Sequence, residues 1–243
     1  MKQDDPKLDV LVIAAHPDDA ELGCGGTILR MKAQGKKVGI ADLTRGELGS
    51  RGTAEIRDAE AAAAAKILDL DARVNIGLRD GFFENVESQQ LAVIEVIRRF
   101  RPEVLLINAP KDRHPDHGRG SRLARDAAFY SGLRRIETSY NGQSQEAWRP
   151  KKTWTYIQDL LLMPDFVVDI SDYMETKMQA IKAYGSQFFN PDSDEPETYI
   201  SSMGFLNQVQ ARATEMGHLI AVSHGEGFIS EKPLRVDDLT AHL

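Results

Sequence analysis

The chain has 243 residues, of which 42% are hydrophobic and 28% are charged, and its formal net charge is −7. These values are close to the averages for soluble globular proteins, so they predict a packed core and exclude a largely disordered chain. Because the excess of acidic residues is spread along the sequence, it argues against nucleic-acid and anionic-membrane partners. We expect residues 1–243 to form a single domain, since α/β folds of this length are commonly one unit.

The N-terminal residues MKQDDPKLDV hold acids and a proline where a secretory signal would need an apolar stretch. Further along the sequence, no apolar run is long enough to span a bilayer. Cys24 is the only cysteine, so the chain cannot form an intramolecular disulfide. Together these features favour a cytoplasmic protein.

Strands and helices are predicted to alternate through the first half of the chain. The segment LDVLVIAA, residues 8–15, is a nearly continuous apolar run with β-branched members, which is typical of the inner strands of parallel sheets. Similar reasoning predicts strands at 38–43, 73–76 and 104–108, and helices at 21–33, 54–68, 89–100 and 117–130. The alternation indicates βαβ units, and therefore a Rossmann-like, doubly wound, mostly parallel α/β sheet with helices on both faces.

After residue 132 the alternation becomes less regular. Residues 138–148 are polar and predict a loop, residues 153–161 and 166–170 predict strands, and residues 173–184 and 203–216 predict helices. No repeat or low-complexity linker separates this part from the rest. We therefore expect a C-terminal elaboration of the same domain.

Polar residues of catalytic type follow three of the predicted strands. The first strand leads directly into HPDD at 16–19, the second ends in TRGE at 44–47, and the strand at 104–108 is followed by KDRHPDH at 111–117. In open α/β sheets, ligands bind in the crevice at the carboxyl ends of the strands. The sequence therefore predicts an active site at this edge of the sheet.

The side chains in these loops include imidazoles and carboxylates without thiolate partners, a set that suits zinc in a hydrolytic site with one open position. His16 and Asp19 are three residues apart where a helix is predicted to begin, so their side chains can converge. His117 could approach from the neighbouring loop. We predict one Zn²⁺ per chain on these three residues, although such a set also binds other divalent ions.

Asp18 and His114 are not among these three predicted metal ligands. Their side chains are of the two types that metal-assisted amide hydrolysis requires. A carboxylate can take a proton from the attacking water, and an imidazole can stabilise or protonate the tetrahedral species. Asp116 could orient His114 from behind. Either motif alone is a weak signal because proline and aspartate are ordinary turn residues, but two such motifs at strand ends favour a functional site over a chance cluster.

Two other kinds of active site find less support. The glycines at 23–26 lack the G-x-G-x-x-G order and the downstream acid of a dinucleotide-binding site, so we interpret them as allowing close packing near the start of the helix. No G-x-S-x-G elbow is present, which argues against a serine hydrolase.

The segments AHPDDAELGCGG and RHPDHGRGSRLARDA resemble the LmbE-like (PIG-L) zinc de-N-acetylases. LTRGELGSRGT, IRDAEAAAAAKILD, NIGLRDGFF and SQFFNPDSDEPETYISS are similar to the branch of that family that takes part in bacillithiol biosynthesis, so the resemblance covers most of the chain. It implies hydrolysis of the acetamide of N-acetylglucosaminyl malate to glucosaminyl malate and acetate. It also implies zinc on His16, Asp19 and His117, with Asp18 as general base and His114 assisting the leaving amine.

The resemblance extends to five candidate substrate-binding residues. Arg51, Arg57 and Asp80 lie in segments that resemble the sugar-binding loops of the family, where arginine could clamp the malate carboxylates. Arg149 and Tyr199 lie in stretches that resemble those supplying a contact on the oxyanion side. Surface ion pairs, or plain surface positions, would explain these residues equally well.

Several alternatives remain open at this point. The substrate could be another N-acetylglucosamine-containing sugar, such as a chitobiose-like sugar or an antibiotic precursor, or the chain could be an amidase of thiol conjugates. A non-catalytic metal-binding or sugar-binding protein, or a nucleotide-binding module, would belong to a different class. His218 and His224 are not expected to be ligands. The family resemblance also implies a homo-oligomer, possibly a hexamer.

Overall fold

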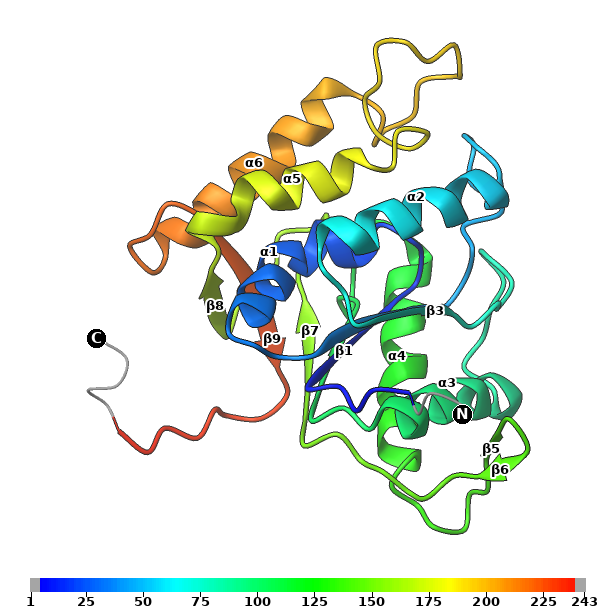
Figure 1. Ribbon diagram of the computed structural model, residues 1–243. Helices are drawn as coiled ribbons and strands as arrows, with labels where there is room; N and C mark the ends of the chain where they lie inside the picture. Colours follow the sequence, from blue (N-terminus) through cyan, green and yellow to red (C-terminus); the bar gives the residue numbers. More distant parts are fainter. Residues whose placement is uncertain (1–4, 239–243) are drawn as a thin grey trace.

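A computed structural model describes residues 5–238. Its main sheet has seven strands in the order β3-β2-β1-β4-β7-β9-β8. The bounds are β1 (Val10–Ala14), β2 (Val38–Asp42), β3 (Ala72–Asn75), β4 (Val104–Ile107), β7 (Lys152–Tyr156), β8 (Phe166–Asp169) and β9 (Gly225–Ser230). The strands from β3 to β7 are parallel, and β9 is antiparallel to both of its neighbours. This confirms the predicted α/β fold with a mostly parallel sheet (Figure 1).

Helices cover both faces of the sheet (Figure 1). They are α1 (Asp19–Ala33), α2 (Ala54–Ile67), α3 (Glu87–Phe100), α4 (Pro115–Tyr130), the short 3₁₀ helix η1 (Ser171–Tyr173), α5 (Met174–Lys182) and α6 (Met203–His218). Alternate residues of β1 separate two cores, because Leu11 and Ile13 pack with residues of α3 and α4, whereas Val12 and Ala14 pack with residues of α1. No helix within residues 5–238 is both long and apolar enough to cross a membrane.

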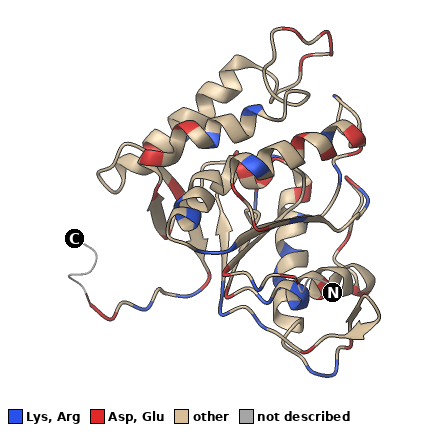
Figure 2. Ribbon diagram, in the orientation of Figure 1, with Lys and Arg blue, Asp and Glu red and all other residues tan. Residues whose placement is uncertain are grey.

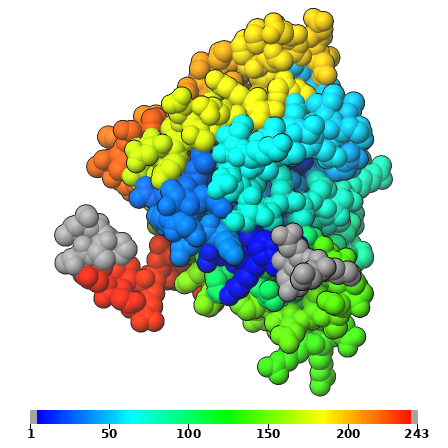
Figure 3. Space-filling model, in the orientation of Figure 1, coloured from blue at the N-terminus to red at the C-terminus, as the bar shows by residue number. Residues whose placement is uncertain are grey.

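A third apolar cluster joins α2 to the C-terminal helices. It contains Ala61 and Ala64 of α2, Ile181 of α5, and Phe205 and Ala213 of α6. In the space-filling view, the segment that includes α5 lies directly against α2 (Figure 3). The C-terminal elaboration is therefore packed onto the N-terminal half of the chain.

The strand register brings the predicted catalytic loops to one edge of the sheet. Ile13 of β1 lies opposite Ile107 of β4, and Ala14 lies opposite Asp42 of β2. The residues that follow these three parallel strands consequently leave the sheet side by side. The loops at 16–19, 44–47 and 111–117 meet at this carboxyl edge, as expected for an open α/β sheet.

Helix α1 is interrupted at Cys24, whose φ of −148° and ψ of 22° are not helical. The backbone N–H groups of Gly26 and Thr27, just after the interruption, donate to the Glu226 carboxylate at 2.9 and 2.7 Å. A Cβ atom at Gly26 would lie 2.7 Å from the Ile170 side chain. The interpretation that these glycines allow close packing is therefore confirmed.

The structure differs from the sequence-based expectation after β7. The predicted strand at 153–161 ends at Tyr156, and residues 157–161 form a loop. Two backbone groups of this loop form hydrogen bonds with side chains outside the sheet. Leu160 N donates to Asp112 Oδ1 at 2.7 Å, and Arg212 donates to the Gln158 carbonyl oxygen at 2.9 Å. These contacts draw the chain away from the sheet and over the carboxyl edge of β4.

Three strands were not predicted, namely β5, β6 and β9. Strand β9 contains Gly225 and Gly227, which lower its strand propensity. A Cβ atom at Gly227 would lie 2.9 Å from Met216 Sδ, so tertiary packing requires glycine at this position. Within the predicted loop 138–148, β5 (Ser139–Tyr140) and β6 (Gln143–Ser144) form a small hairpin. Its turn is Asn141-Gly142, and both residues have positive φ as tight hairpins require.

Candidate active site

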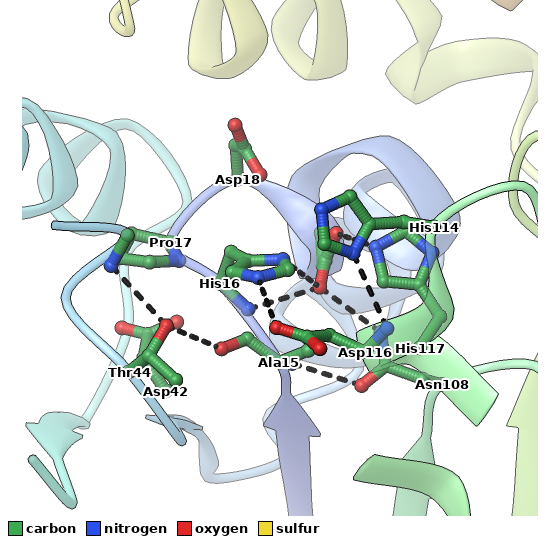
Figure 4. Close-up of polar contacts among 12 residues, drawn as sticks. Ala15, His16, Pro17, Asp18, Asp42, Thr44, Asn108, His114, Asp116 and His117 are labelled. Carbon is green, nitrogen blue, oxygen red and sulfur yellow. Dashed lines mark hydrogen bonds and ion pairs between the residues drawn. The ribbon is translucent and has the colours of Figure 1, made fainter. Parts of the chain in front are cut away.

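The predicted metal ligands converge at the carboxyl edge of the sheet. His16 Nδ1 lies 3.6 Å from Asp19 Oδ2, and His117 Nε2, in the first turn of α4, lies 3.1 Å from Asp19 Oδ1. One ring nitrogen from each of His16, His114 and His117 falls within 4.8 Å of the others. Figure 4 shows the three imidazoles gathered above the end of β1. His16 and His117 are far apart in the sequence, and the parallel pairing of β1 with β4 brings them together.

In each of the two candidate histidine ligands, the ring nitrogen that faces away from Asp19 contacts a carboxylate. His16 Nε2 lies 3.0 Å from Asp80 Oδ1 and 3.2 Å from Asp116 Oδ2, and His117 Nδ1 lies 2.5 Å from Asp112 Oδ2. A proton on each outward nitrogen leaves the lone pairs of His16 Nδ1 and His117 Nε2 directed at Asp19. Metal-binding histidines are commonly oriented in this way. Two imidazoles and one carboxylate, with such support behind them, fit a divalent cation.

Asp19 is held by amide side chains as well as by histidines. Asn108 Nδ2 donates to Asp19 Oδ2 at 3.0 Å, and Gln158 Nε2 donates to Asp19 Oδ1 at 3.0 Å. Asn108 also accepts the Ala15 N–H at 2.9 Å, which ties the end of β4 to the end of β1. These donors fix the carboxylate so that its oxygens face both histidines.

Charges are strongly coupled in this cluster. Burial disfavours the charged form of His117, but Asp19 and the hydrogen bond to Asp112 outweigh burial and raise the pKa of His117 to about 9. Burial opposes ionisation of Asp19, yet His117 and His16 hold its pKa well below the usual range. Without a cation, imidazolium rings therefore balance the buried carboxylates. A divalent cation would supply the same positive charge after those protons leave.

Asp18 precedes α1 and adopts a rare backbone conformation, with a φ of 117°. Such strain is retained where the surrounding structure requires it, and it is frequent at functional sites. Only 5% of Asp18 is exposed, and Arg57 Nη2 donates to its Oδ2 at 3.1 Å. Burial raises the pKa of Asp18 to about 7, against the opposing effect of Arg57. A carboxylate with this pKa can take up and release a proton near neutral pH.

Arg57 has contacts that indicate a positioning role. It donates to Asp18, to the Pro17 carbonyl oxygen and, through Nη1, to Gln187 Oε1 at 2.8 Å. Arg57 also lines a cavity, and its contacts with Asp18 and Pro17 hold its guanidinium group against the loop that carries Asp18. It was predicted as a substrate-binding residue, and the structure adds this second role.

His114 caps the N-terminus of α4. Its Nδ1 accepts the backbone N–H of Asp116 at 3.2 Å, so the proton of the neutral ring lies on Nε2. Burial lowers the pKa of His114, and the neighbouring His16 and His117 lower it further. His114 is therefore a neutral hydrogen-bond donor near pH 7.

Asp116 does not orient His114 through its carboxylate, as the sequence had suggested. That group accepts from His16 Nε2, from Gly81 N at 2.9 Å and from Arg119 Nη1 at 2.6 Å. Figure 4 shows Asp116 beside His16. The first turn of α4 directs the side chain of Asp116 toward His16 and Gly81, so only the backbone N–H of Asp116 contacts His114.

A cavity of about 390 Å³ opens over this cluster, within the range usual for ligand pockets. Asp18, Asp80, Arg51 and Tyr199 line it. Asp80 was predicted to bind sugar hydroxyls, but one of its oxygens is already 3.0 Å from His16. Tyr199 is 49% exposed at the mouth, and its hydroxyl contacts Asp159 Oδ1 at 3.0 Å.

Arg51 lies in the cavity wall and is 5% exposed. Its Nη2 donates to Ser193 Oγ at 2.5 Å, and its Nε lies 3.7 Å from Glu195 Oε2. Both partners belong to the acidic loop between α5 and α6 (Figure 2). Within residues 5–238, Arg51 Nε has no hydrogen-bond partner although it is buried. This unused donor is suited to an anionic ligand.

Arg149 lies elsewhere in the fold. It precedes β7, its Nη2 donates to the Phe129 carbonyl oxygen at 2.8 Å, and its guanidinium lies 4.3 Å from the Phe129 ring centre. Because it precedes a parallel strand, Arg149 lies at the opposite edge of the sheet from the cavity. The prediction that it contacts the substrate is wrong for the site of a single chain. His218 and His224 are not among the residues that line the cavity.

Three supporting residues were missed from the sequence, namely Asn108, Asp112 and Gln158. Asn108 is the first residue after β4, and Gln158 is the second residue after β7, so their position after a strand was an available signal. Asp112 lies in the loop that leads into α4, five residues before His117. The contact of Asp112 with His117 depends on the orientation of the His117 ring, and the spacing of these residues in the sequence does not predict that orientation.

Comparison with known proteins identifies the family. A family model described as PIG-L: GlcNAc-PI de-N-acetylase matches residues 11–128. The 1D-myo-inositol 2-acetamido-2-deoxy-alpha-D-glucopyranoside deacetylase of Saccharomonospora viridis is 30% identical over 228 residues, which cover 73% of this chain and 84% of that protein. A Bacillus subtilis protein named "Probable N-acetyl-alpha-D-glucosaminyl L-malate deacetylase 2" is 29% identical over 198 residues, covering 74% and 84%.

Solved structures show the same fold. The conserved protein TT1542 from Thermus thermophilus superposes with a TM-score of 0.85 and 38% identity, covering 96% of this chain and 98% of that chain. The N,N'-diacetylchitobiose deacetylase from Pyrococcus horikoshii has a TM-score of 0.77 and 26% identity, covering 90% and 82%. The predicted resemblance is thereby confirmed, and the chain belongs to the PIG-L family of LmbE-like de-N-acetylases.

Proposed function

We propose that this chain hydrolyses the acetamide of N-acetylglucosaminyl malate, using one Zn²⁺ or a similar divalent ion held by His16, Asp19 and His117. The observation that carries the hydrolytic part is the convergence of both histidines on the two oxygens of Asp19, with Asp18 beside them at a pKa of about 7. The observation that favours malate is the guanidinium group of Arg51 in the same cavity, whose buried Nε has no hydrogen-bond partner among residues 5–238 and only a long ion-pair contact with Glu195. The name of the Bacillus subtilis relative supports the same substrate.

A bound cation would act as a Lewis acid toward the acetyl carbonyl and the attacking water. Asp18 is placed to accept the proton of that water, because its carboxylate lines the cavity and its pKa is near neutral. His114 lines the cavity and carries its proton on Nε2, so it can donate to the carbonyl oxygen or to the departing nitrogen of a bound substrate. Asp80, Asp112 and Asp116 hold the two histidines in place.

The test measures acetate release from N-acetylglucosaminyl malate and from N,N'-diacetylchitobiose, with metal-loaded and chelator-treated protein. We expect rapid, chelator-sensitive release from the malate compound. Arg51→Ala should lower kcat/KM for the malate compound by about 10-fold to 100-fold, the value of a charge-assisted hydrogen bond. Its effect on the neutral sugar should be small.

Arg45→Ala is the matched control, because Arg45 lies in the same loop but is paired with Asp58 on the surface. Equal rates on the two sugars, with no dependence on Arg51, would instead favour a neutral chitobiose-like substrate. Bound metal without hydrolysis of either sugar would indicate a binding protein.

A further inference from the structure

Gln187 contacts two of the arginines that line the cavity. It lies in the cavity lining itself, and only 5% of the residue is exposed. Gln187 Oε1 accepts from Arg57 Nη1 at 2.8 Å, and Gln187 Nε2 donates to the backbone carbonyl oxygen of Arg51 at 2.8 Å. The same nitrogen also donates to Ser186 Oγ at 2.9 Å. One buried amide group is therefore engaged through both its oxygen and its nitrogen.

The chemistry of the two partners determines which way this amide faces. A guanidinium group can only donate hydrogen bonds, so the oxygen of Gln187 must face Arg57. A backbone carbonyl can only accept, so the nitrogen must face Arg51. Ionised glutamate has no hydrogen to donate, and methionine has neither a strong donor nor a strong acceptor. Among side chains of this length, only glutamine can make both contacts.

The contact with Arg57 acts on the proposed general base. Arg57 Nη2 donates to Asp18 Oδ2 at 3.1 Å and also to the Pro17 carbonyl oxygen. Gln187 holds the other terminal nitrogen of the same planar group. Without that acceptor the guanidinium would be free to rotate, and the direction of its hydrogen bond to Asp18 would no longer be fixed.

The contact with Arg51 acts on the proposed malate-binding group. Arg51 lies in the loop between β2 and α2, and this loop packs closely against the segment that follows α5. Gly52 has a φ of 70°, and a Cβ atom there would lie 2.8 Å from Ser186 Oγ. The hydrogen bond from Gln187 fixes the point of the loop from which the Arg51 side chain extends along the cavity wall.

Gln187 is itself held firmly. Its backbone N–H donates to the Tyr184 carbonyl oxygen at 2.9 Å, and the next side chain, Phe188, is buried in the third apolar cluster. Ser186 N and Oγ donate to the Glu60 carboxylate of α2 at 2.7 and 2.8 Å. A side chain on such a support can fix the positions of the groups that it contacts.

We propose that Gln187 is a positioning residue that holds Arg57 against Asp18 and holds Arg51 at the substrate anion, so that one amide group aligns the general base with the bound substrate. The proposal rests on the function proposed above, since it takes Asp18 as general base and Arg51 as the malate-binding group. Neither hydrogen bond involves a candidate metal ligand, so a change at Gln187 should leave the metal content unchanged.

The experiment measures kcat and KM for N-acetylglucosaminyl malate and for N,N'-diacetylchitobiose with metal-loaded protein. Gln187→Met keeps the length of the side chain and removes both hydrogen bonds. We expect kcat to fall by about tenfold on both sugars, because Asp18 is less precisely directed. The preference for malate, defined as the ratio of the two kcat/KM values, should also fall by about threefold to tenfold, the value of one hydrogen bond.

Gln187→Glu separates the two contacts, because a carboxylate still accepts from Arg57 but cannot donate to Arg51. The kcat on the neutral sugar should therefore stay within about threefold of the wild-type value. Gln210→Met is the matched control, because Gln210 is exposed on α6 and is not among the residues that line the cavity. It should change neither kcat nor the preference for malate.

A double-mutant cycle separates positioning from a general loosening of the fold. If Gln187 acts on malate through Arg51, adding Gln187→Met to Arg51→Ala should lower the preference for malate no further. A general defect would lower that preference equally with and without Arg51. If Gln187→Met fails to fold, Gln187→Glu takes its place, and its loss of preference should be smaller in the Arg51→Ala background.

Wild-type kcat and wild-type preference in a folded Gln187→Met protein would overturn the positioning role and leave the proposed function intact. An equal loss of preference with and without Arg51 would overturn it in the same way. A wild-type protein that hydrolyses neither sugar would overturn both proposals.

Discussion

The segment from β1 to α4 and the segment from β7 to β9 contribute in different ways to the same cavity. The first carries His16, Asp18, Asp19, His114 and His117, which lie in the segments that follow β1 and β4. The second supplies one wall of the cavity, the Lys177–Glu226 ion pair, and Gln158, which donates to the candidate metal ligand Asp19. The difference suggests that the first segment sets the chemistry and, through Arg51, the choice of substrate, whereas the second segment supports the site. The predictions below test that division.

Asp18→Asn should have the largest effect, with a loss of about 10²-fold to 10⁴-fold in kcat. The asparagine amide cannot accept the proton of the attacking water. The candidate metal ligands His16, Asp19 and His117 are unchanged, so the metal content should stay near one ion per chain. Rate assays and metal analysis of the same sample check this. Asp58→Asn, on the surface, is the control. Loss of metal together with activity would show that Asp18 belongs to the ligand set.

Glu226→Ala should destabilise the protein by about 3–5 kcal/mol, because it leaves Lys177 buried without its partner. Urea unfolding measures this, and Glu231→Ala, at an exposed ion pair, should change stability little. The double variant Lys177→Met with Glu226→Gln should recover part of the loss. A Glu226→Ala protein as stable as the wild type would mean that the C-terminal segment is not the support described here.

Asp112→Asn should weaken metal binding by about 10-fold to 100-fold, since it removes the carboxylate that orients His117. Competition with a fluorescent chelator measures the affinity. Asp172→Asn, an exposed acid far along the chain, serves as the comparison. Unchanged affinity in Asp112→Asn would argue against His117 as a ligand.

A smaller effect concerns pH. The pKa of His117 rises from 6.5 to about 9 in the folded protein without metal, so the stability from its charged form is complete below pH 6.5 and is lost as pH rises through 9. The Tm of chelator-treated protein should fall over this interval. The metal-loaded protein should not show the same fall, because metal and protons compete for the same nitrogen. Parallel Tm profiles for the two forms would contradict the assignment.

The sequence predicted those parts of the site that depend on local signals. The strand predicted at 104–108 is found at 104–107, and the helix predicted from residue 21 begins at Asp19. His16 and His117 could be singled out because His16 opens, and His117 directly follows, an HPD motif in the segment after a predicted strand. Arg57 was harder to interpret, since its contact with Asp18 spans 39 residues and depends on how α2 packs. Strand β9 was missed because its glycines serve packing against Met216, a tertiary constraint that propensity does not record.

The interruption of α1 at Cys24 also bears on the order in which the site is assembled during synthesis. The second part of this helix begins with N–H groups that donate to Glu226, a residue near the end of the chain. The ribosome therefore completes His16, Asp19 and His117 long before the group that secures the helix following them. A nascent chain that stops before Glu226 would hold the candidate ligands but would lack the anchor for α1.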